Sequence, residues 1–550
     1  MLAAPGALAP AAAAPAPGFV DEVVISGLTA PTDLEFAADG TVFVAEQSGI
    51  IKRFASIGSS STTYVDLSAE VLAQGGRGLM GIALDPNFPT SPNVYALYDL
   101  DQSLAPSATI PTYNDACTAP CASHARVKRL TGTTTATTQT VLLDGWCQLA
   151  DKHTVDDIEV GPDGALYVSS GDAATEKYAD TGQTDDPCGD PPGEGGSLRV
   201  QDLQTAGDPV GFEGTVLRLD ATTGAAAAGN PASASPDANT RRIISYGSRN
   251  PWRLTFRPGT TELYIAENGW NTTEELNTID VGGAPVTNFG WPCFEGNVAV
   301  ADFAGTSICQ HLPQSATQGP TFSYQHSQPL FAGSACMPDG SSNSAIAFAG
   351  NNSYPARFHN ALFLGDFARG CIVAVRAGPD GRPNYAAMED VVVNAARPMD
   401  LEAGPGGDIY YLDYIGGAVH RIRWTGPANP TPTPAFTSVT PSRIYDSRPG
   451  EKPTAGSTRT ITVAGRGGVP TTGAAAVAVT VTVTGTQPDD LGYLTAWPTG
   501  PRPNTSNLNL TPGQTAANVA IVPLAPDGTI QLYTSGQTHI LIDVIAWIPN

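Results

Sequence analysis

Short apolar strands separated by glycine-rich turns recur along the first three quarters of the chain. In AADGTVFVAEQSGIIKRF, at Ala37–Phe54, a turn precedes an apolar strand, a small polar tip and a second strand with a basic end. Alternating apolar and polar positions bounded by Gly, Pro, Asn and Asp are typical of β-strands. Further copies follow at uneven spacing, at Asp85–Leu100, Gly161–Asp172, Arg257–Gly269, Asn360–Arg376 and Gly404–Trp424.

These six copies predict a repeat architecture. A strand pair cannot bury both of its faces alone, so neighbouring copies must pack against one another. Radial arrangement of small sheets leaves only short, protected edges and suits this repetition. We therefore predict an all-β protein in which residues 20–424 form a six-bladed β-propeller. A long array of β-sandwiches is the alternative.

The pattern changes at a proline- and threonine-rich stretch, TGPANPTPTPAF, at Thr425–Phe436. Proline-rich segments without hydrophobic periodicity are extended linkers, so residues 425–435 are predicted to join two domains. Eight short strand-like runs follow within residues 436–550, and several of them alternate strictly. Closely spaced short strands with turn signals between them predict a small β-sandwich.

Composition excludes other classes of protein. The 550 residues include 59 Gly and 47 Pro and only 15% are charged, and a chain interrupted so often cannot form a helical bundle or coiled coil. A net charge of −24 argues against a nucleic-acid partner. No apolar run reaches the ~18 residues that a membrane span needs. Lysine is scarce and is confined to Lys52, Lys128, Lys152, Lys177 and Lys452.

The cysteines indicate an oxidising compartment. The eight cysteines form no CxxC pair and lack zinc-ligand spacing, so disulfides are expected, with free thiols as the alternative. Residues 1–19 lack a basic start and are interrupted by prolines, so they make a poor signal peptide as they stand. We expect the remnant of a signal peptide or a disordered N-terminus, and we predict a secreted protein. Pairing by sequence order, one of many possible connectivities, links Cys117–Cys121, Cys147–Cys188, Cys293–Cys309 and Cys336–Cys371.

The first segment with candidate chemistry is DKHTVDDIEVGPDG, which leads into a repeated strand. His153 is one of seven histidines, and imidazole is the natural general base near neutral pH. The neighbouring Asp151, Asp156 and Asp157 are expected to raise the pKa of His153 or to orient its ring. A structural histidine that bridges elements is the alternative.

The second segment is GSRNPWRLTFRPG followed by AENGWNTTEELN. Arg249 keeps its charge and presents a fork that suits a carboxylate or quinone oxygen. Gly269 and Trp270 are placed to offer backbone carbonyls to a hard cation such as Ca²⁺. A salt-bridged arginine and an ordinary turn are the alternative. The third segment, the acidic loop Gly171–Gly193, lacks EF-hand spacing and is expected to be solvated, with Ca²⁺ binding as the second possibility.

Together these segments resemble the secreted PQQ-dependent glucose/sorbosone dehydrogenase family. The resemblance covers residues 20–424 in collinear order. It implies a six-bladed propeller that oxidises a sugar or polyol hydroxyl by hydride transfer to PQQ and passes electrons to an external acceptor. The stretches that carry it include GRGLMGIALDPNF, HTVDDIEVGPDGALYVSSGD, FEGTVLRLDATTG, YGSRNPWRLTFRPGTTELYIAENGWNTTEELN, NFGWPCFEG and RPMDLEAGPGGDIYYLD.

The resemblance also implies roles for individual residues. His153 matches the catalytic base, and Arg249 would stabilise negative charge on the reduced cofactor. Gly269 and Trp270 stand where backbone carbonyls bind Ca²⁺, with Trp270 in place of a proline. The residues that match cofactor-binding positions are Arg249, Asn250, Arg369 and Arg397.

The chain departs from the family pattern at three positions. Gly76 stands in place of a glutamine, Ala368 of a lysine and Met399 of an arginine. PQQ carries carboxylates, and each charge-assisted hydrogen bond to one is worth about 1.5–3 kcal/mol. Other residues replace these partners, or the affinity for PQQ is low, or the cofactor is absent. In the last case the alternatives are a carbohydrate- or protein-binding propeller, or a hydrolytic use of an axial Ca²⁺ site.

The C-terminal segment resembles a β-module found at the ends of secreted actinobacterial proteins. The resemblance rests on VTPSRIYDSRPG, the strand-rich stretch from Ser506 to Gly536, and HILIDVIAWI. His539 is its only histidine and it has no cysteine, so we expect no chemical role. Attachment to cell-wall polysaccharide is the expected function.

Overall fold

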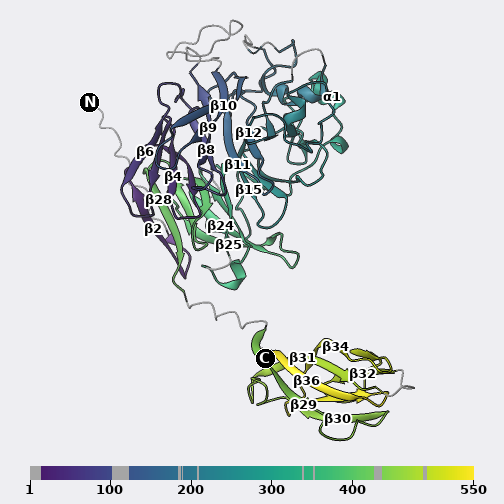
Figure 1. Ribbon diagram of the computed structural model, residues 1–550. Coiled ribbons are helices and arrows are strands. Elements are labelled where there is room, and N and C mark those ends of the chain that lie inside the picture. The colour runs from purple at the N-terminus through teal and green to yellow at the C-terminus, as the bar shows by residue number, and fades with distance from the viewer. Residues whose placement is uncertain are drawn as a thin grey trace. The chain divides into compact units, whose positions relative to one another are not determined.

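The computed structural model has two compact units, residues 1–427 and 428–550, which we describe separately. Strands dominate both units (Figure 1). Within the part of the chain that the structure describes, the single α-helix is α1 (Ser307–His311). The described residues are 14–101, 123–183, 188, 190–206, 210–336, 340–350, 353–426, 436–486 and 492–549.

The first unit contains six main sheets, each formed largely by consecutive strands. The first comprises β3 (Pro31–Phe36), β4 (Val42–Glu46), β5 (Ile50–Phe54) and β6 (Ser61–Asp66). The second comprises β7 (Leu79–Leu84), β8 (Asn93–Leu100), β9 (Ser123–Thr131) and β10 (Thr138–Gln148). The third comprises β11 (Val155–Val160), β12 (Leu166–Ser170), β13 (Thr215–Leu219), β14 (Ile243–Tyr246) and β18 (Thr287–Asn288).

The remaining three sheets follow the same order from first strand to last. The fourth comprises β15 (Pro251–Phe256), β16 (Glu262–Glu267), β17 (Thr273–Asp280) and β21 (Phe322–Gln325). The fifth comprises β22 (Asn343–Phe348), β23 (Leu362–Asp366), β24 (Cys371–Ala377), β25 (Pro383–Val393) and β1 (Ala14–Pro15). The sixth comprises β26 (Pro398–Ala403), β27 (Ile409–Asp413), β28 (Ala418–Trp424) and β2 (Phe19–Ser26). Minor elements are β19 (Phe294–Glu295), β20 (Val298–Ala299) and 3₁₀ helices at Gly196–Gln204, Thr240–Arg242, Gln314–Ala316 and Ala356–Phe358.

The six sheets are the blades of a β-propeller. Their first strands β3, β7, β11, β15, β22 and β26 contact one another in that order, and β26 contacts β3 to close the ring. The N-terminal β2 completes the sixth blade by pairing with β28, with Phe19 opposite Trp424. The predicted six-bladed propeller is confirmed, and each sequence copy supplies the second strand of one blade.

The residues just before β2 also belong to this folded unit. Ala14 and Pro15 pair with β25 in the fifth blade. The buried Phe19 packs its ring 5.3 Å from that of Phe358. Ala14, Pro15 and Phe19 therefore belong to sheets of the propeller, whereas the sequence suggests a signal-peptide remnant or a disordered end for residues 1–19. Residues 1–13, and most of the predicted linker 425–435, lie outside the described residues.

A β-bulge recurs in the first strand of every blade. The pairing register shifts within β3, β7, β11, β15, β22 and β26, each time near the start of the strand. Bulges re-aim side chains and are common beside active sites. Four residues at these shifts, Met80, Trp252, Ser344 and Met399, line one central cavity.

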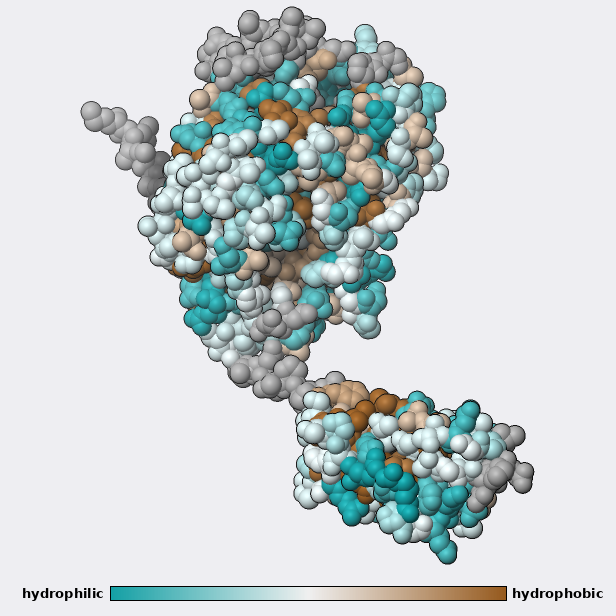
Figure 2. All heavy atoms as spheres, in the orientation of Figure 1, coloured by the Kyte–Doolittle hydropathy of each residue, from teal (hydrophilic) through white to brown (hydrophobic). Residues whose placement is uncertain are grey.

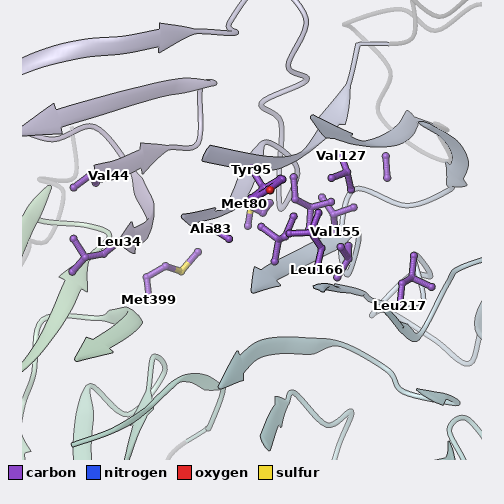
Figure 3. Packing of buried hydrophobic residues seen from close by; sticks show 14 of the residues in the cluster. Leu34, Val44, Met80, Ala83, Tyr95, Val127, Val155, Leu166, Leu217 and Met399 are labelled. Carbon is purple, nitrogen blue, oxygen red and sulfur yellow. The ribbon is translucent and has the colours of Figure 1, made fainter. Parts of the chain in front are cut away.

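The hydrophobic core of the propeller extends to this cavity. One cluster of buried side chains joins several blades and includes Leu34, Val155, Met80 and Met399 (Figure 3). Full burial of a large apolar side chain contributes about 1.5–3 kcal/mol. Because Met80 and Met399 belong both to the cluster and to the cavity wall, core packing determines the shape of the cavity.

The second unit is a β-sandwich, as predicted. One sheet has the strand order β29-β36-β31-β34 and the other β30-β35-β32-β33, and a single buried cluster includes Val479, Leu494, Leu532 and Ile542. Hydrophilic side chains gather over the face of this unit seen in Figure 2. The strands are β29 (Thr437–Asp446), β30 (Ser457–Thr462), β31 (Ala474–Thr484), β32 (Gly492–Trp497), β33 (Leu508–Leu510), β34 (Ala516–Pro523), β35 (Thr529–Thr534) and β36 (His539–Pro549).

Disulfides join three of the predicted cysteine pairs. The bonds Cys147–Cys188, Cys293–Cys309 and Cys336–Cys371 are present. The fourth predicted pair, Cys117–Cys121, lies outside the described residues. Among the described helices, none is long and apolar enough to span a membrane.

Candidate active site

A cavity of about 730 Å³ lies where the bulged first strands meet the loops between blades. Its volume is within the range of small-molecule sites. It brings together five residues that the sequence singles out: His153, Arg249, Asn250, Gly269 and Trp270. These residues are up to 117 positions apart along the chain, and only closure of the propeller places them in one wall.

A carboxylate orients His153. The Nδ1 atom of His153 lies 2.9 Å from Oδ1 of Asp172, and Oδ2 of Asp172 accepts a hydrogen bond of 2.9 Å from the Trp291 indole. Asp172 is 1% exposed and the His153 side chain is 10% exposed. Because Nδ1 is occupied by this contact, Nε2 is the imidazole nitrogen left to meet a ligand in the cavity.

The site keeps His153 neutral and Asp172 ionised. Burial, followed by the positive charge of Arg249, lowers the pKa of His153 from its ordinary 6.5, and Asp172 opposes this effect. The pKa of Asp172 is lowered despite burial, because His153, Arg249 and the backbone N–H of Ala174 favour its carboxylate. A neutral imidazole that donates through Nδ1 presents a lone pair on Nε2, as a general base requires.

This partner of His153 differs from the sequence expectation. The neighbouring Asp151, Asp156 and Asp157 do not orient the ring, and the pKa of His153 falls rather than rises. Asp157 instead accepts a hydrogen bond of 2.7 Å from the backbone N–H of Leu254. Adjacent side chains on a strand point to opposite faces, so proximity in sequence does not place a carboxylate on the histidine.

Backbone strain is concentrated at the same place. His153 and Ala173 have φ values of +50°, and the backbone N–H of Ala173 donates to the His153 carbonyl over 2.8 Å. Non-glycine residues with positive φ cost about 1–3 kcal/mol each and cluster at functional sites. Gly171 packs against the start of the His153 side chain, where an added Cβ would come within 2.7 Å of the His153 Cβ.

Arg249 is held in the cavity wall by backbone carbonyls and an aromatic ring. Its Nη1 donates to the carbonyls of Asn268 (3.1 Å) and Gly269 (2.7 Å), and its guanidinium lies 5.8 Å from the ring of Trp291. Its backbone N–H donates to the buried Glu267, whose pKa is raised to about 8 mainly by burial. Arg249 is 6% exposed, so its charge is fixed in position at the cavity.

Gly269 and Trp270 are arranged differently from the Ca²⁺ site that the resemblance implies. The Gly269 carbonyl already accepts a hydrogen bond from Arg249, and a guanidinium at this oxygen opposes a second cation. The backbone N–H groups of Trp270, Asn271 and Thr272 all point to Oε1 of Glu295. The described residues contain no cluster of three His, Cys, Asp or Glu side chains that could hold a metal ion. The residues present do not fit a Ca²⁺ ion without movement of Arg249.

Two predicted arginines lie outside the cavity wall. Arg369 is buried and donates to the carbonyls of Gln325, His326 and Gln328, with its Nε 3.3 Å from Asp366. These hydrogen bonds hold the end of β21 and the residues that follow it in place.

Arg397 is the second predicted arginine that lies outside the cavity wall. It is exposed and donates to the carbonyls of Phe367 and Ala368, over the Phe367 ring. Of the three departures from the family pattern, Gly76 and Met399 line the cavity. Ala368 does not, and it offers its carbonyl to Arg397 instead.

Several residues of the cavity carry no signal in the sequence that assigns them to it. Lys152, Lys177, Glu274 and His326 all line it, and Nε2 of His326 lies 2.9 Å from Oε1 of Glu274. The acidic loop is a cavity wall rather than a simply solvated segment, since Glu176 and Lys177 face the cavity and Asp172 holds His153. The scarcity of lysine is the one compositional hint, because two of the five lysines are here.

The fold and the site define the chain as a six-bladed propeller with a histidine–carboxylate pair and a buried arginine in its central cavity. The family model of glucose/sorbosone dehydrogenases matches residues 28–418. The chain therefore belongs to the glucose/sorbosone dehydrogenase family, and the resemblance seen in the sequence is confirmed. Membership supports an oxidoreductase role.

Known proteins similar to this chain agree with that assignment. Quinoprotein glucose dehydrogenase B of Acinetobacter calcoaceticus is 24% identical over 434 residues, which cover 72% of this chain and 85% of that protein. A solved putative oxidoreductase (glucose dehydrogenase) from Thermus thermophilus is 24% identical, with a TM-score of 0.52 over 74% of this chain and 100% of that chain. The PQQ-bound aldose sugar dehydrogenase of Streptomyces coelicolor is 19% identical, with a TM-score of 0.50 over 74% of this chain and 99% of that chain. The two structures show that the fold is shared.

Proposed function

We propose that this protein is a secreted PQQ-dependent dehydrogenase that oxidises a hydroxyl group of a sugar or polyol. The observation that carries the proposal is the buried His153–Asp172 pair in a cavity large enough for a cofactor and a sugar. Family membership and the PQQ-bound form of one similar structure support the choice of cofactor. The three disulfides support secretion, because disulfides persist in oxidising compartments.

The residues of the cavity fit an anionic, polar cofactor such as PQQ. Asn250 lines the cavity, and its buried Oδ1 atom accepts no hydrogen bond in the described part of the chain, so it is available to an N–H or O–H group of a polar ligand. Among the described residues, Arg249 contacts neighbouring carbonyls through Nη1 alone, which leaves N–H groups for a carboxylate or quinone oxygen. When bound, PQQ supplies the quinone that takes two electrons and one proton from the substrate carbon.

The chain's own residues account for the other proton. His153 would accept the substrate hydroxyl proton at Nε2, so that the carbonyl product forms as the carbon is oxidised. Asp172 would stabilise the resulting imidazolium through its contact with Nδ1. Arg249, fixed by Asn268 and Gly269, would stabilise negative charge that develops beside it. Because the Ca²⁺ ligands do not fit, no step is assigned to a metal.

Addition of PQQ to the purified full-length protein tests this function. We expect a saturable change in the PQQ absorbance at micromolar concentrations, followed by dye reduction when aldoses or polyols are added. The same assay with and without added Ca²⁺ measures whether the metal is required. Absence of PQQ binding by the wild-type protein would favour the alternative, an extracellular carbohydrate- or protein-binding propeller.

The pH dependence of kcat/KM reports the state of His153. We expect activity to be lost as pH falls, with a midpoint below 6.5, because the base works only when neutral and its pKa is lowered. Asp172→Asn removes a charge that raises this pKa, so the midpoint is expected to move to still lower pH and the rate to fall about tenfold to hundredfold.

Asp151→Asn is the matched control for this experiment. Asp151 is exposed, only two residues from His153, and is absent from the causes of its pKa shift. We expect the wild-type pH profile in this variant. An unchanged profile in Asp172→Asn, in a protein with the wild-type thermal transition, would remove Asp172 from the proposed positioning role.

A further inference from the structure

Two lysines in the cavity wall have no partner among the residues that the structure describes. Lys152 and Lys177 both line the cavity, and neither ammonium group makes a hydrogen bond or ion pair with any residue in the described part of the chain. The other two lysines of the propeller are paired: Nζ of Lys52 lies 2.7 Å from Glu46, and Lys128 contacts Glu70. In a chain with a net charge of −24, two uncommitted cations at one cavity indicate an anionic ligand.

The position of Lys152 is linked to one departure from the family pattern. A Cβ built on Gly76 would lie 3.6 Å from Cδ of Lys152, so the lysine stem packs directly over the glycine. A longer side chain at residue 76 would compete with this stem for space. The glycine backbone is also tied to the same segment, because its N–H donates to the Asp151 carbonyl over 2.8 Å.

Lys177 reaches the cavity from the acidic loop. The loop is tied to the propeller by Cys147–Cys188 and by the ion pair of Asp190 with the buried Arg199. The Lys177 side chain itself is exposed, as expected for a cation at the mouth of a cavity. Together with Arg249, the two lysines place three basic side chains in the lining of the cavity.

The two carboxylates in the cavity lining, Glu176 and Glu274, form no ion pair with either lysine among the described residues. Glu274 is 1% exposed and is already engaged by His326, Ser341 and the backbone N–H of Asn343. Glu176, next to Lys177, is exposed to solvent. The positions where the family pattern has cations are apolar here: Met399 packs into the hydrophobic core, and Ala368 has no charge.

We propose that Lys152 and Lys177 bind carboxylates of PQQ and replace the lysine and arginine that are missing at positions 368 and 399. The inference rests on the proposed function, because it identifies how the same cavity holds its cofactor. The positive charge would then lie on the segments that flank β11 and β12 instead of on the turn between β23 and β24 and on β26. The absence of the family lysine therefore does not remove the charge-assisted bonds that PQQ requires.

Binding titrations with PQQ and with its trimethyl ester test this proposal. In the ester the three carboxylates are blocked, so it reports binding without their charge. We expect Lys152→Met to weaken PQQ binding about tenfold or more, and Lys177→Met about threefold to tenfold because its side chain is exposed. Binding of the trimethyl ester is expected to be unchanged in both variants. Lys152→Arg, which keeps the charge, should retain most of the affinity for PQQ.

Lys52→Met is the control, because Lys52 belongs to the same unit but pairs with Glu46 away from the cavity. It should leave the dissociation constant of PQQ unchanged. Wild-type affinity for PQQ in the Lys152→Met, Lys177→Met double variant would overturn the lysine assignment while leaving the proposed function in place. Equal loss of affinity for PQQ and for its ester would also overturn it. Failure of the wild-type protein to bind PQQ would overturn the proposed function itself.

Discussion

His153→Asn is expected to reduce turnover of the PQQ-loaded protein by about 10²–10⁴-fold. The substitution removes the Nε2 atom that accepts the substrate proton, while Arg249 and Asn250 remain to hold the cofactor. Asparagine is preferred to alanine because His153 has a φ of +50°, a conformation that asparagine tolerates. Single-turnover dye reduction and PQQ titration on the same sample separate the rate from the affinity.

The matched control for this substitution is His311→Asn. His311 is exposed on α1, and its Nδ1 lies 2.7 Å from the Ser307 carbonyl, outside the cavity wall. Its replacement should leave both turnover and PQQ affinity at wild-type values. Turnover within threefold of wild type in His153→Asn would rule out His153 as the base. Loss of PQQ binding in that variant would show that His153 supports the cofactor rather than the proton transfer.

Arg253→Met is expected to lower the free energy of unfolding of the propeller by about 3–5 kcal/mol. Arg253, on β15, is 2% exposed, and its side chain contacts Asp400 (3.1 Å) and Asp157 (3.7 Å). The carboxyl group of Asp33 also lies close enough to Arg253 to raise the pKa of its guanidinium, as Asp157 and Asp400 do. Methionine preserves the length of the side chain but leaves these carboxyl groups, from three other blades, without their shared cation.

The loss should depend on pH. Burial raises the pKa of Asp157 to about 6 and raises that of Asp400, while Arg253 lowers both. Without the arginine these folded-state pKa values rise further above their unfolded values. The variant therefore loses stability as pH rises through that range, and its difference from wild type narrows as pH falls and the carboxyls become neutral.

Urea unfolding at pH 5 and pH 8, followed by tryptophan fluorescence, measures this effect. The control is Arg257→Met, because Arg257 pairs with Glu262 over 2.6 Å but is 19% exposed, and such pairs contribute about 0–1 kcal/mol. A loss in Arg253→Met no larger than in this control, or equal at both pH values, would contradict the role assigned to the central arginine.

The repeat of strands could be read from the sequence because it depends on local rules. Alternation of apolar and polar residues and turn glycines such as Gly40 and Gly164, with φ of +87° and +76°, act over a few residues. The same holds for the sandwich strands and for the three observed disulfides, whose cysteines are neighbours in order. These features set the number of blades before any long-range contact is known.

Recognition of His153 and Arg249 also came from the sequence, since both lie in motifs beside repeated strands. The residue that orients the His153 ring could not be identified from the sequence. Five aspartates are closer to His153 along the chain than Asp172. Asp172 nevertheless reaches the ring because β11 and β12 pair antiparallel, with Val155 opposite Ser170. Strand pairing brings the two ends of a hairpin together, and spacing alone does not say which carboxylate that is.

The sequence by itself therefore determined the propeller, the sandwich and the family, and it identified the histidine and arginine on which the proposed chemistry depends. Only the tertiary structure decided how these residues are partnered: that Asp172 orients His153, that Arg249 occupies the Gly269 carbonyl, and that Lys152 and Lys177 face the same cavity. The physical reason is that strand formation follows from the local order of residues. The charge around a central cavity is instead the sum of side chains from six blades, and their positions are determined only when the ring closes.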